Sequence, residues 1–232
     1  TDHMDNRGIT MQGTMSLFTG RLESMLALQD GINSRINGDW RGAGNPWYRA
    51  IWTECSELMD HIGWKWWKRQ EPDTAQVHLE LVDILHFGLS ELLQLHGSAL
   101  AAASCSIAAY EDYAGTHPIA TDVATRLSLV EAFASKTLNS RSFDLGAFGK
   151  LAVAFELEEL SLFEKYAGKN VLNTFRQDHG YRDGTYQKIW GGREDNEWLS
   201  EIASGISKDA STFSEELYRQ LADKYQEVSV GR

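Results

Sequence analysis

Scarcity of proline is the feature that most constrains this chain, because only three of its 232 residues are proline: Pro46, Pro72 and Pro118. Each lies at a break between segments of helical periodicity, as expected of a residue that lacks a backbone N–H and clashes with the preceding helical turn. The stretches between the breaks are long enough for helices of several turns. Period-2 alternation bounded by turn residues is hard to find, so no sheet is expected. The sequence therefore predicts an all-α fold.

Helical periodicity predicts five long helices, at residues 17–37, 46–62, 75–103, 121–139 and 143–168, and shorter helices within 169–178, 194–205 and 212–226. In the third segment one face carries only apolar side chains and belongs in a core: Val82, Leu85, Leu89, Leu92 and Leu93. Residues 180–196 are rich in Gly, Tyr, Arg, Lys and Asp and show little periodicity. They are expected to form a long loop.

Charge and cysteine content exclude several classes of protein. A net charge of -11 argues against a polymeric nucleic-acid partner, because neutralising phosphates requires an excess of Lys and Arg. Cys55 and Cys105 lie inside helical patterns, so neither a disulfide framework nor a cysteine zinc site is expected, and an intracellular, cytoplasmic location fits. No apolar stretch approaches membrane-span length and no signal peptide is recognisable, so a soluble protein without a membrane partner is expected. Residues 1–4 fit an expression scar.

Two pairs of acidic residues share the same spacing. Glu54 and Glu57 lie three residues apart, so on a helix they share one face, and Glu80 and Asp83 repeat this spacing. The segment between the pairs, residues 63–74, contains a glycine and a proline and is short enough to join two antiparallel helices. Such a connection would gather four carboxylates at one helix–helix seam.

An all-oxygen set of ligands suits a hard cation such as Mg²⁺, which Mn²⁺ can replace. A single Glu-x-x-Glu pair is more often a solvated helix face, and two facing pairs leave the metal site and the solvated face about equally open. A di-iron centre is the competing metal site, but it requires Glu-x-x-His on two helices. His61 follows Glu57 by four residues and His86 follows Asp83, so iron chemistry is disfavoured.

The two acidic pairs resemble the signature of the all-α NTP pyrophosphohydrolase superfamily, which also includes MazG-like proteins and dCTPases. Further segments resemble the dimeric dUTPases: residues 28–33 (LQDGIN), 63–68 (GWKWWK), 80–87 (ELVDILHF), 169–177 (KNVLNTFRQ), 184–190 (GTYQKIW) and 194–196 (EDN). This resemblance implies an all-α helical bundle with a mobile C-terminal helical and loop lobe. It implies one domain, with a rigid metal-binding core at about residues 14–168 and a mobile phosphate-binding segment at about 169–196.

The activity implied by the resemblance is Mg²⁺-dependent hydrolysis of dUTP, and also of dUDP, to dUMP by metal-activated water. Pyrophosphate is released from dUTP and phosphate from dUDP. In this interpretation Glu54, Glu57, Glu80 and Asp83 are the catalytic residues and metal ligands, and Glu54 also orients or deprotonates the attacking water. The resemblance also implies a homodimer.

Uracil binding is implied for Gln29, Asn33, Trp66, His86 and Phe87. Gln29 and Asn33 lie at i and i+4, and a side-chain amide can both donate to a uracil carbonyl and accept from its N3–H. The choice among Trp64, Trp66 and Trp67 stays open. Phe87 equally suits core packing, which is the commoner use of phenylalanine.

Phosphate and sugar binding is implied for Lys169, Asn173, Arg176, Lys188 and Asn196. The first three lie at i, i+4 and i+7, along one stripe of a helix. Two alternatives remain: a dCTPase or MazG-like pyrophosphohydrolase with the same metal site, and a non-catalytic regulator that binds nucleotide. Release of dUMP from dUTP, but not of product from dCTP or dTTP, would separate these hypotheses.

Overall fold

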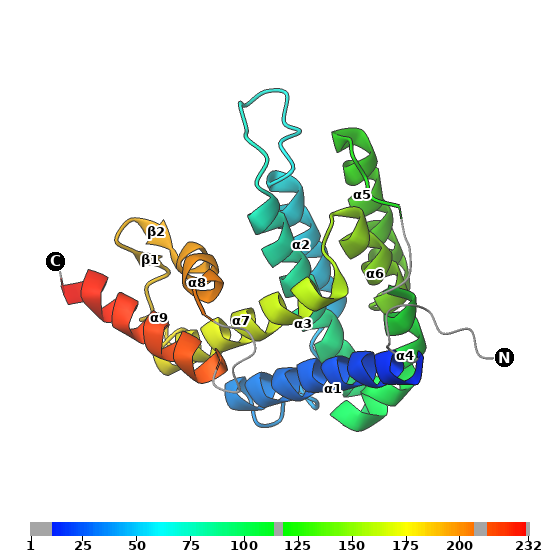
Figure 1. Ribbon diagram of the computed structural model, residues 1–232, viewed down its shortest axis with the longest axis horizontal. Helices are drawn as coiled ribbons and strands as arrows, with labels where there is room; N and C mark the ends of the chain where they lie inside the picture. Colours follow the sequence, from blue (N-terminus) through cyan, green and yellow to red (C-terminus); the bar gives the residue numbers. More distant parts are fainter. Residues whose placement is uncertain (1–10, 114–117, 207–212, 231–232) are drawn as a thin grey trace. The chain divides into compact units, whose positions relative to one another are not determined.

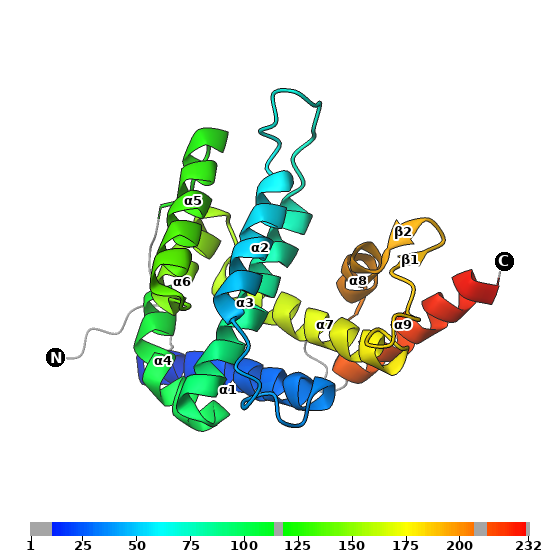
Figure 2. The same ribbon diagram turned by 180° about the vertical axis from the view of Figure 1, so that it is seen from behind.

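The computed structural model describes residues 11–113, 118–206 and 213–230, and most of them are helical (Figures 1 and 2). The helices are α1 (Met11–Ile36), α2 (Trp47–Asp60), α3 (Thr74–His96), α4 (Ala99–Tyr113), α5 (Val123–Ser140), α6 (Leu145–Ala154), α7 (Glu159–Asp178), α8 (Asp195–Ser204) and α9 (Phe213–Val230). A two-stranded antiparallel hairpin, β1 (Ile189–Trp190) and β2 (Arg193–Glu194), lies between α7 and α8. The all-α prediction is confirmed, and this short hairpin is the only β-structure among the described residues. Residues 1–4, interpreted as a scar, lie outside the described residues.

The chain divides into two compact units, which are described separately. Unit 1 comprises Thr1–Ala27 and Pro46–Glu159, and unit 2 comprises Leu28–Asn45 and Leu160–Arg232. The helix α1 contributes to both units, and α7 begins with the last residue of unit 1. The single domain with a mobile segment at residues 169–196 stays a prediction.

In unit 1, α2 and α3 run antiparallel, side by side (Figures 1 and 2). Their connecting loop is closed where the Asp73 backbone N–H donates to the His61 carbonyl at 2.9 Å. The other face of α2 packs against α5, while α3 also contacts α4 and α6. The predicted core stripe of α3 is buried, and so are Leu81 and Ile84 on its other faces, so α3 is the central helix of this unit.

Three helices of unit 1 begin at an aspartate that caps the first turn. The side chains of Asp73, Asp122 and Asp144 each accept a hydrogen bond from a backbone N–H three residues later, at the start of α3, α5 and α6. These bonds satisfy donors that have no partner inside the helix. The capping aspartates thus determine where these helices begin. In α3 this places Glu80 and Asp83 in the second and third turns.

The single helix predicted at residues 75–103 is wrong. Gly97 adopts a φ of 81°, ends α3 in the left-handed conformation that glycine favours, and α4 begins two residues later. The two helices meet at a 117° bend. Within the described residues no single helix is long and apolar enough to cross a membrane, and α3 and α4 reach that length and apolarity only when taken together.

The single helix predicted at residues 143–168 is also wrong, because α6 ends at Ala154 and α7 runs from Glu159 past Gly168 to Asp178. At the break Glu156 has a φ of 61°. Side chains from distant helices satisfy two of the carbonyls there: His78 Nε2 bonds to the Phe155 oxygen at 2.8 Å, and the Tyr113 hydroxyl donates to the Leu157 oxygen at 2.6 Å. Tertiary hydrogen bonds therefore stabilise this break.

Unit 2 contains a core rich in aromatic rings. Phe175 of α7 contacts Trp190 of β1 and Tyr218 and Tyr225 of α9, with ring centroids 5.5–5.6 Å apart. Tyr186 stacks on Tyr225 at 5.7 Å. The segment 180–196 is irregular apart from β1, β2 and the start of α8, as predicted, and these rings pack it against the helices of its own unit.

Candidate active site

Three acidic side chains of unit 1 meet across the seam between α2 and α3. One carboxylate oxygen from each of Glu54, Glu57 and Glu80 lies within 4.8 Å of the others. The arrangement follows from the helical period, because burial of Ile51 and Leu58 fixes the rotation of α2 about its axis. Glu80 is buried, Glu54 is half-buried and Glu57 is exposed, so the cluster extends from the core to solvent.

The electrostatics of this cluster favour a cation. Two unit charges at 4.8 Å repel by about 3.5 kcal/mol at an effective dielectric constant of 20. His61, which follows α2, places Nε2 3.3 Å from Glu80 Oε1. Asp83 lies one turn beyond Glu80 on α3 and is half-buried, outside the group of three. The all-oxygen donor set fits a hard divalent cation, and the structure brings together three of the four predicted ligands.

Two of the predicted uracil-binding residues, Gln29 and Asn33, are buried on the part of α1 that belongs to unit 2. Gln29 Nε2 donates to Asn33 Oδ1 at 2.9 Å, and the hydroxyl of Tyr166 on α7 donates to Gln29 Oε1 at 2.5 Å. The two amides are therefore held in one orientation. Tyr166 was not predicted as a site residue, and only its long-range contact with Gln29 reveals it.

The other predicted uracil-binding residues lie in unit 1. Trp66 lies in the loop between α2 and α3, 85% exposed, with its ring centroid 4.6 Å from that of Trp67. His86 is buried, and the half-buried ring of Phe87 lies 6.4 Å from that of Trp47 at a 31° tilt. The contact with Trp47 agrees with a packing role for Phe87. The contribution of residues from both units to one base site stays a prediction.

All five residues predicted to bind phosphate and sugar lie in unit 2. Lys169 is buried on α7 and donates through Nζ to Asn196 Oδ1 of α8 at 3.0 Å. Arg176 lies about two turns beyond Lys169 on the same helix and donates through Nη1 to Asn173 Oδ1 at 3.3 Å. Lys188 is exposed in the loop. The predicted residues thus form two hydrogen-bonded pairs and one exposed cation.

Sequence reasoning assigned no role to Asp195, the first residue of α8. Its side chain is fully buried and accepts hydrogen bonds from Arg176 Nε and Nη2, both at 2.8 Å, and from the Tyr186 hydroxyl at 2.9 Å. Burial alone would raise the pKa of Asp195, but the hydrogen bonds and charge of Arg176 hold this pKa below its ordinary value. The sequence signal was present, because Asp195 belongs to the EDN segment that resembles the dimeric dUTPases.

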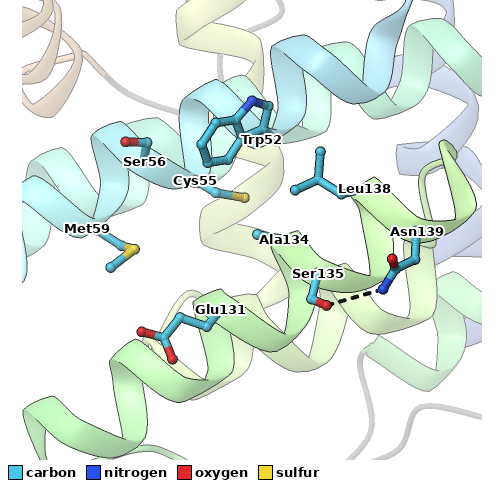
Figure 3. A pocket seen from close by; sticks show the side chains of 9 residues that line it. All are labelled: Trp52, Cys55, Ser56, Met59, Glu131, Ala134, Ser135, Leu138 and Asn139. Atoms are coloured by element: carbon cyan, nitrogen blue, oxygen red, sulfur yellow. Dashed lines mark hydrogen bonds between the residues drawn. The ribbon is translucent and has the colours of Figure 1, made fainter.

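A pocket of about 360 Å³ opens between α2 and α5, on the side of α2 opposite the acidic cluster (Figure 3). Trp52, Cys55 and Met59 face Ala134 and Leu138 across it. Burial, and to a smaller extent the charge of Glu54, raises the pKa of the Cys55 thiol to about 12, so the thiol is neutral. The one charged residue among the nine that line the pocket is Glu131. This lining lacks the cations that a polyphosphate requires.

Comparison with family models identifies the relatives of this chain. A model described as dUTPase matches residues 21–181, well over half of the chain. The chain belongs to the dimeric, all-α dUTPase family. Comparison with curated proteins gives no match. The region matched to the dUTPase model includes the acidic cluster, Gln29 and Arg176, and it ends before Lys188 and Asp195.

As a member of this dUTPase family the protein is a dUTP diphosphatase, which hydrolyses dUTP. The polyphosphate of dUTP is an anion, and the acidic cluster repels it. A divalent cation resolves this conflict, in keeping with the general dependence of dUTPases on such ions. The basic residues of unit 2 have the charge that phosphate binding needs.

Proposed function

We propose that this enzyme hydrolyses dUTP, and also dUDP, to dUMP with Mg²⁺ as its cofactor, and that Mn²⁺ can replace Mg²⁺. Pyrophosphate is released from dUTP and phosphate from dUDP. The observation that carries this proposal is the approach of Glu54, Glu57 and Glu80 to within 4.8 Å in a chain of the dUTPase family. Asp83, one turn beyond Glu80 on the same helix, completes the ligand set.

The bound cation lowers the pKa of water and offsets the charge that develops on the phosphoryl oxygens. The protein's own part is to orient the attacking water and to hold its ligands in place. Glu54 is half-buried, which leaves its carboxylate reachable by water, and it orients the nucleophile or accepts its proton. Glu80 is fixed by burial and by its contact with His61.

Recognition of the nucleotide is divided between its phosphates and its base. Phosphates and sugar bind Lys169, Asn173, Arg176, Lys188 and Asn196. Uracil binds the amides of Gln29 and Asn33, with Trp66, His86 and Phe87 as further base contacts. The bond from Tyr166 to Gln29 supports base selectivity, because a fixed amide presents its donor and acceptor in one order.

The segment of residues 169–196 closes over the phosphates when nucleotide binds. Four glycines in its loop have positive φ and provide joints at which the backbone can turn: Gly180, Gly184, Gly191 and Gly192. Amide hydrogen exchange with and without a non-hydrolysable dUTP analogue and Mg²⁺ measures this closure. Equal protection in both samples would show that the segment is a preformed wall.

The enzyme acts as a homodimer, as other members of its family do. The support is membership of the family together with apolar side chains exposed in unit 1, such as Trp52 and Leu138. Light scattering at micromolar concentration should give twice the 26.1 kDa mass of one chain. A mass of one chain would contradict this part of the proposal.

A panel of nucleotides tests the substrate. Incubation with Mg²⁺ should release dUMP from dUTP and from dUDP, with little turnover of dCTP or dTTP, and chelation should abolish turnover. Preference for dCTP, or broad hydrolysis of all triphosphates, would favour a dCTPase or a MazG-like enzyme. Tight binding of dUTP without turnover would indicate a regulator.

A further inference from the structure

Residues 195 and 196, at the start of α8, contact all three of the cationic residues predicted to bind phosphate. The Asp195 backbone N–H donates to the carbonyl of Lys188 at 2.9 Å. The Asp195 carboxylate accepts from Arg176 through two hydrogen bonds of 2.8 Å, and Asn196 accepts from Lys169 at 3.0 Å. One short stretch of chain thus contacts Arg176, 19 residues before Asp195, and Lys169, 27 residues before Asn196.

The carboxylate of Asp195 is costly to bury and is compensated by its partners. It is fully buried, and a buried carboxylate is tolerated only where it is paired and hydrogen-bonded. Both oxygens bond to the planar guanidinium of Arg176, which fixes its orientation more closely than a single contact would. A third donor, the Tyr186 hydroxyl, holds the carboxylate itself.

The charge of Asp195 also reduces the repulsion among the cations. Lys169 and Arg176 lie on one helix, two turns apart, and the positive charge of both acts on Asp195. A buried anion on which both charges act lowers the free energy needed to gather these cations before a nucleotide arrives. A preformed group of cations loses less conformational entropy when phosphate binds.

We propose that Asp195 is a positioning residue for phosphate binding. Its carboxylate holds the side chain of Arg176 in place for the polyphosphate of dUTP, and its backbone N–H holds the chain at Lys188. The inference rests on the proposed function, because it assumes that Arg176 and Lys188 bind phosphate. It goes beyond the family match, which ends at residue 181. Asp195 acts through its partners, so its loss weakens ligands that carry phosphate and spares recognition of the base.

The test compares two ligands of Asp195→Asn by calorimetry: a non-hydrolysable dUTP analogue with Mg²⁺, and deoxyuridine, which has no phosphate. The dissociation constant of the analogue should rise by about tenfold, equivalent to about 1.4 kcal/mol. That of deoxyuridine should change by less than about twofold, below about 0.4 kcal/mol, because Asp195 acts through residues that bind phosphate and not through those that bind the base. In turnover the KM for dUTP should rise more than kcat falls. Equal weakening of both ligands would show a general loosening of unit 2 and would overturn the proposal.

A matched control exists in unit 1. Glu159 is a buried carboxylate that accepts one hydrogen bond from Arg21 and one from the Tyr110 hydroxyl, both at 2.5 Å, so it also pairs with an arginine and a tyrosine, as Asp195 does. Glu159→Gln should lower the Tm and leave both dissociation constants unchanged. A rise in the analogue's dissociation constant equal to that of Asp195→Asn would show that any buried carboxylate has this effect, which overturns the specific role of Asp195.

Four further variants make the result decisive. Tyr186→Phe removes one donor to Asp195 and serves if Asp195→Asn does not fold; it should weaken the analogue by about threefold, in line with one hydrogen bond. In an Arg176→Gln background, Asp195→Asn should add less than about twofold, because coupled residues are not additive. Full additivity would refute action through Arg176.

Arg176→Gln and Lys188→Ala distinguish failure of this inference from failure of the proposed phosphate site. If both variants leave the affinity for the analogue intact, the proposed phosphate site itself fails. If they weaken binding of the analogue and Asp195→Asn does not, only this inference fails.

Discussion

Replacing Glu54 by glutamine should stabilise the protein without metal and should reduce the stabilisation that Mg²⁺ provides. In the metal-free protein Glu54 is repelled by two carboxylates within 4.8 Å. Each repulsion lies between about 0.9 kcal/mol at the dielectric constant of water and about 3.5 kcal/mol at an effective value of 20. Because Glu54 is half-buried and Glu57 is exposed, values near the lower limit apply, for a total of about 1–2 kcal/mol. Glu54→Gln should therefore raise the Tm in chelator by roughly 2–8 °C.

With Mg²⁺ this gain in stability should largely disappear, because the variant binds the ion more weakly. A concentration 100 times the dissociation constant stabilises the native state by about 2.7 kcal/mol, and a tenfold weaker site leaves about 1.4 kcal/mol at the same concentration. Thermal unfolding in chelator and across a Mg²⁺ titration measures both effects, and turnover should fall by orders of magnitude. Glu131, an exposed carboxylate of α5, lies outside the cluster and provides the matched control: Glu131→Gln should change neither the Tm nor turnover. Near-normal turnover of Glu54→Gln at saturating Mg²⁺ would refute the reasoning.

Three further outcomes are expected. Burial raises the pKa of Glu91, although the hydrogen bond from the Phe143 backbone N–H opposes this shift, so the protein loses stability as the pH rises through the folded-state pKa. Glu91→Gln should therefore raise the Tm at pH 8 but not at pH 4, and an equal gain at both pH values would contradict this. A Cβ at Gly88 would lie 2.6 Å from the Phe143 ring, so Gly88→Ala should lower the free energy of unfolding by about 1–3 kcal/mol in a denaturant titration. Tyr166→Phe removes the donor to Gln29 and should weaken deoxyuridine binding by roughly 2–10-fold; unchanged affinity would show that Gln29 needs no such support.

The acidic cluster could be predicted from sequence because its causes are local. The spacing of Glu54 and Glu57 places them on one face of any helix, and the connection between α2 and α3 is short enough to join an antiparallel pair. The apolar period of α3 then determines which side faces the core. Glu80 is the exception to this simple picture, because it is buried although its neighbours in the cluster are not.

The break after α6 and the role of Asp195 could not be predicted, because their causes are tertiary. Nothing between Phe155 and Glu158 is glycine or proline, and the break there depends on hydrogen bonds from His78 and Tyr113, 77 and 44 residues away from the carbonyls that accept them. Gly168 is the end of the helix predicted at residues 143–168, but it lies inside α7, where an added Cβ would contact Leu199 and Leu217. Asp195 acquires its role only from the fold of unit 2, which brings Arg176 to it.

The tryptophan cluster of the loop between α2 and α3 gives this protein an optical signal of its own. The rings of Trp64, Trp66 and Trp67 lie with centroids 4.6–6.1 Å apart, close enough for their electronic transitions to couple. Coupled indoles give intense near-ultraviolet circular dichroism that depends on their mutual angles, and the exposed rings of Trp66 and Trp67 fluoresce at a wavelength sensitive to water. This loop joins the two helices that carry the acidic cluster, so the spectrum of its tryptophans reports on the loop in unlabelled enzyme. A difference spectrum between the wild type and Trp66→Phe separates the signal of the loop from that of the other tryptophans of the chain.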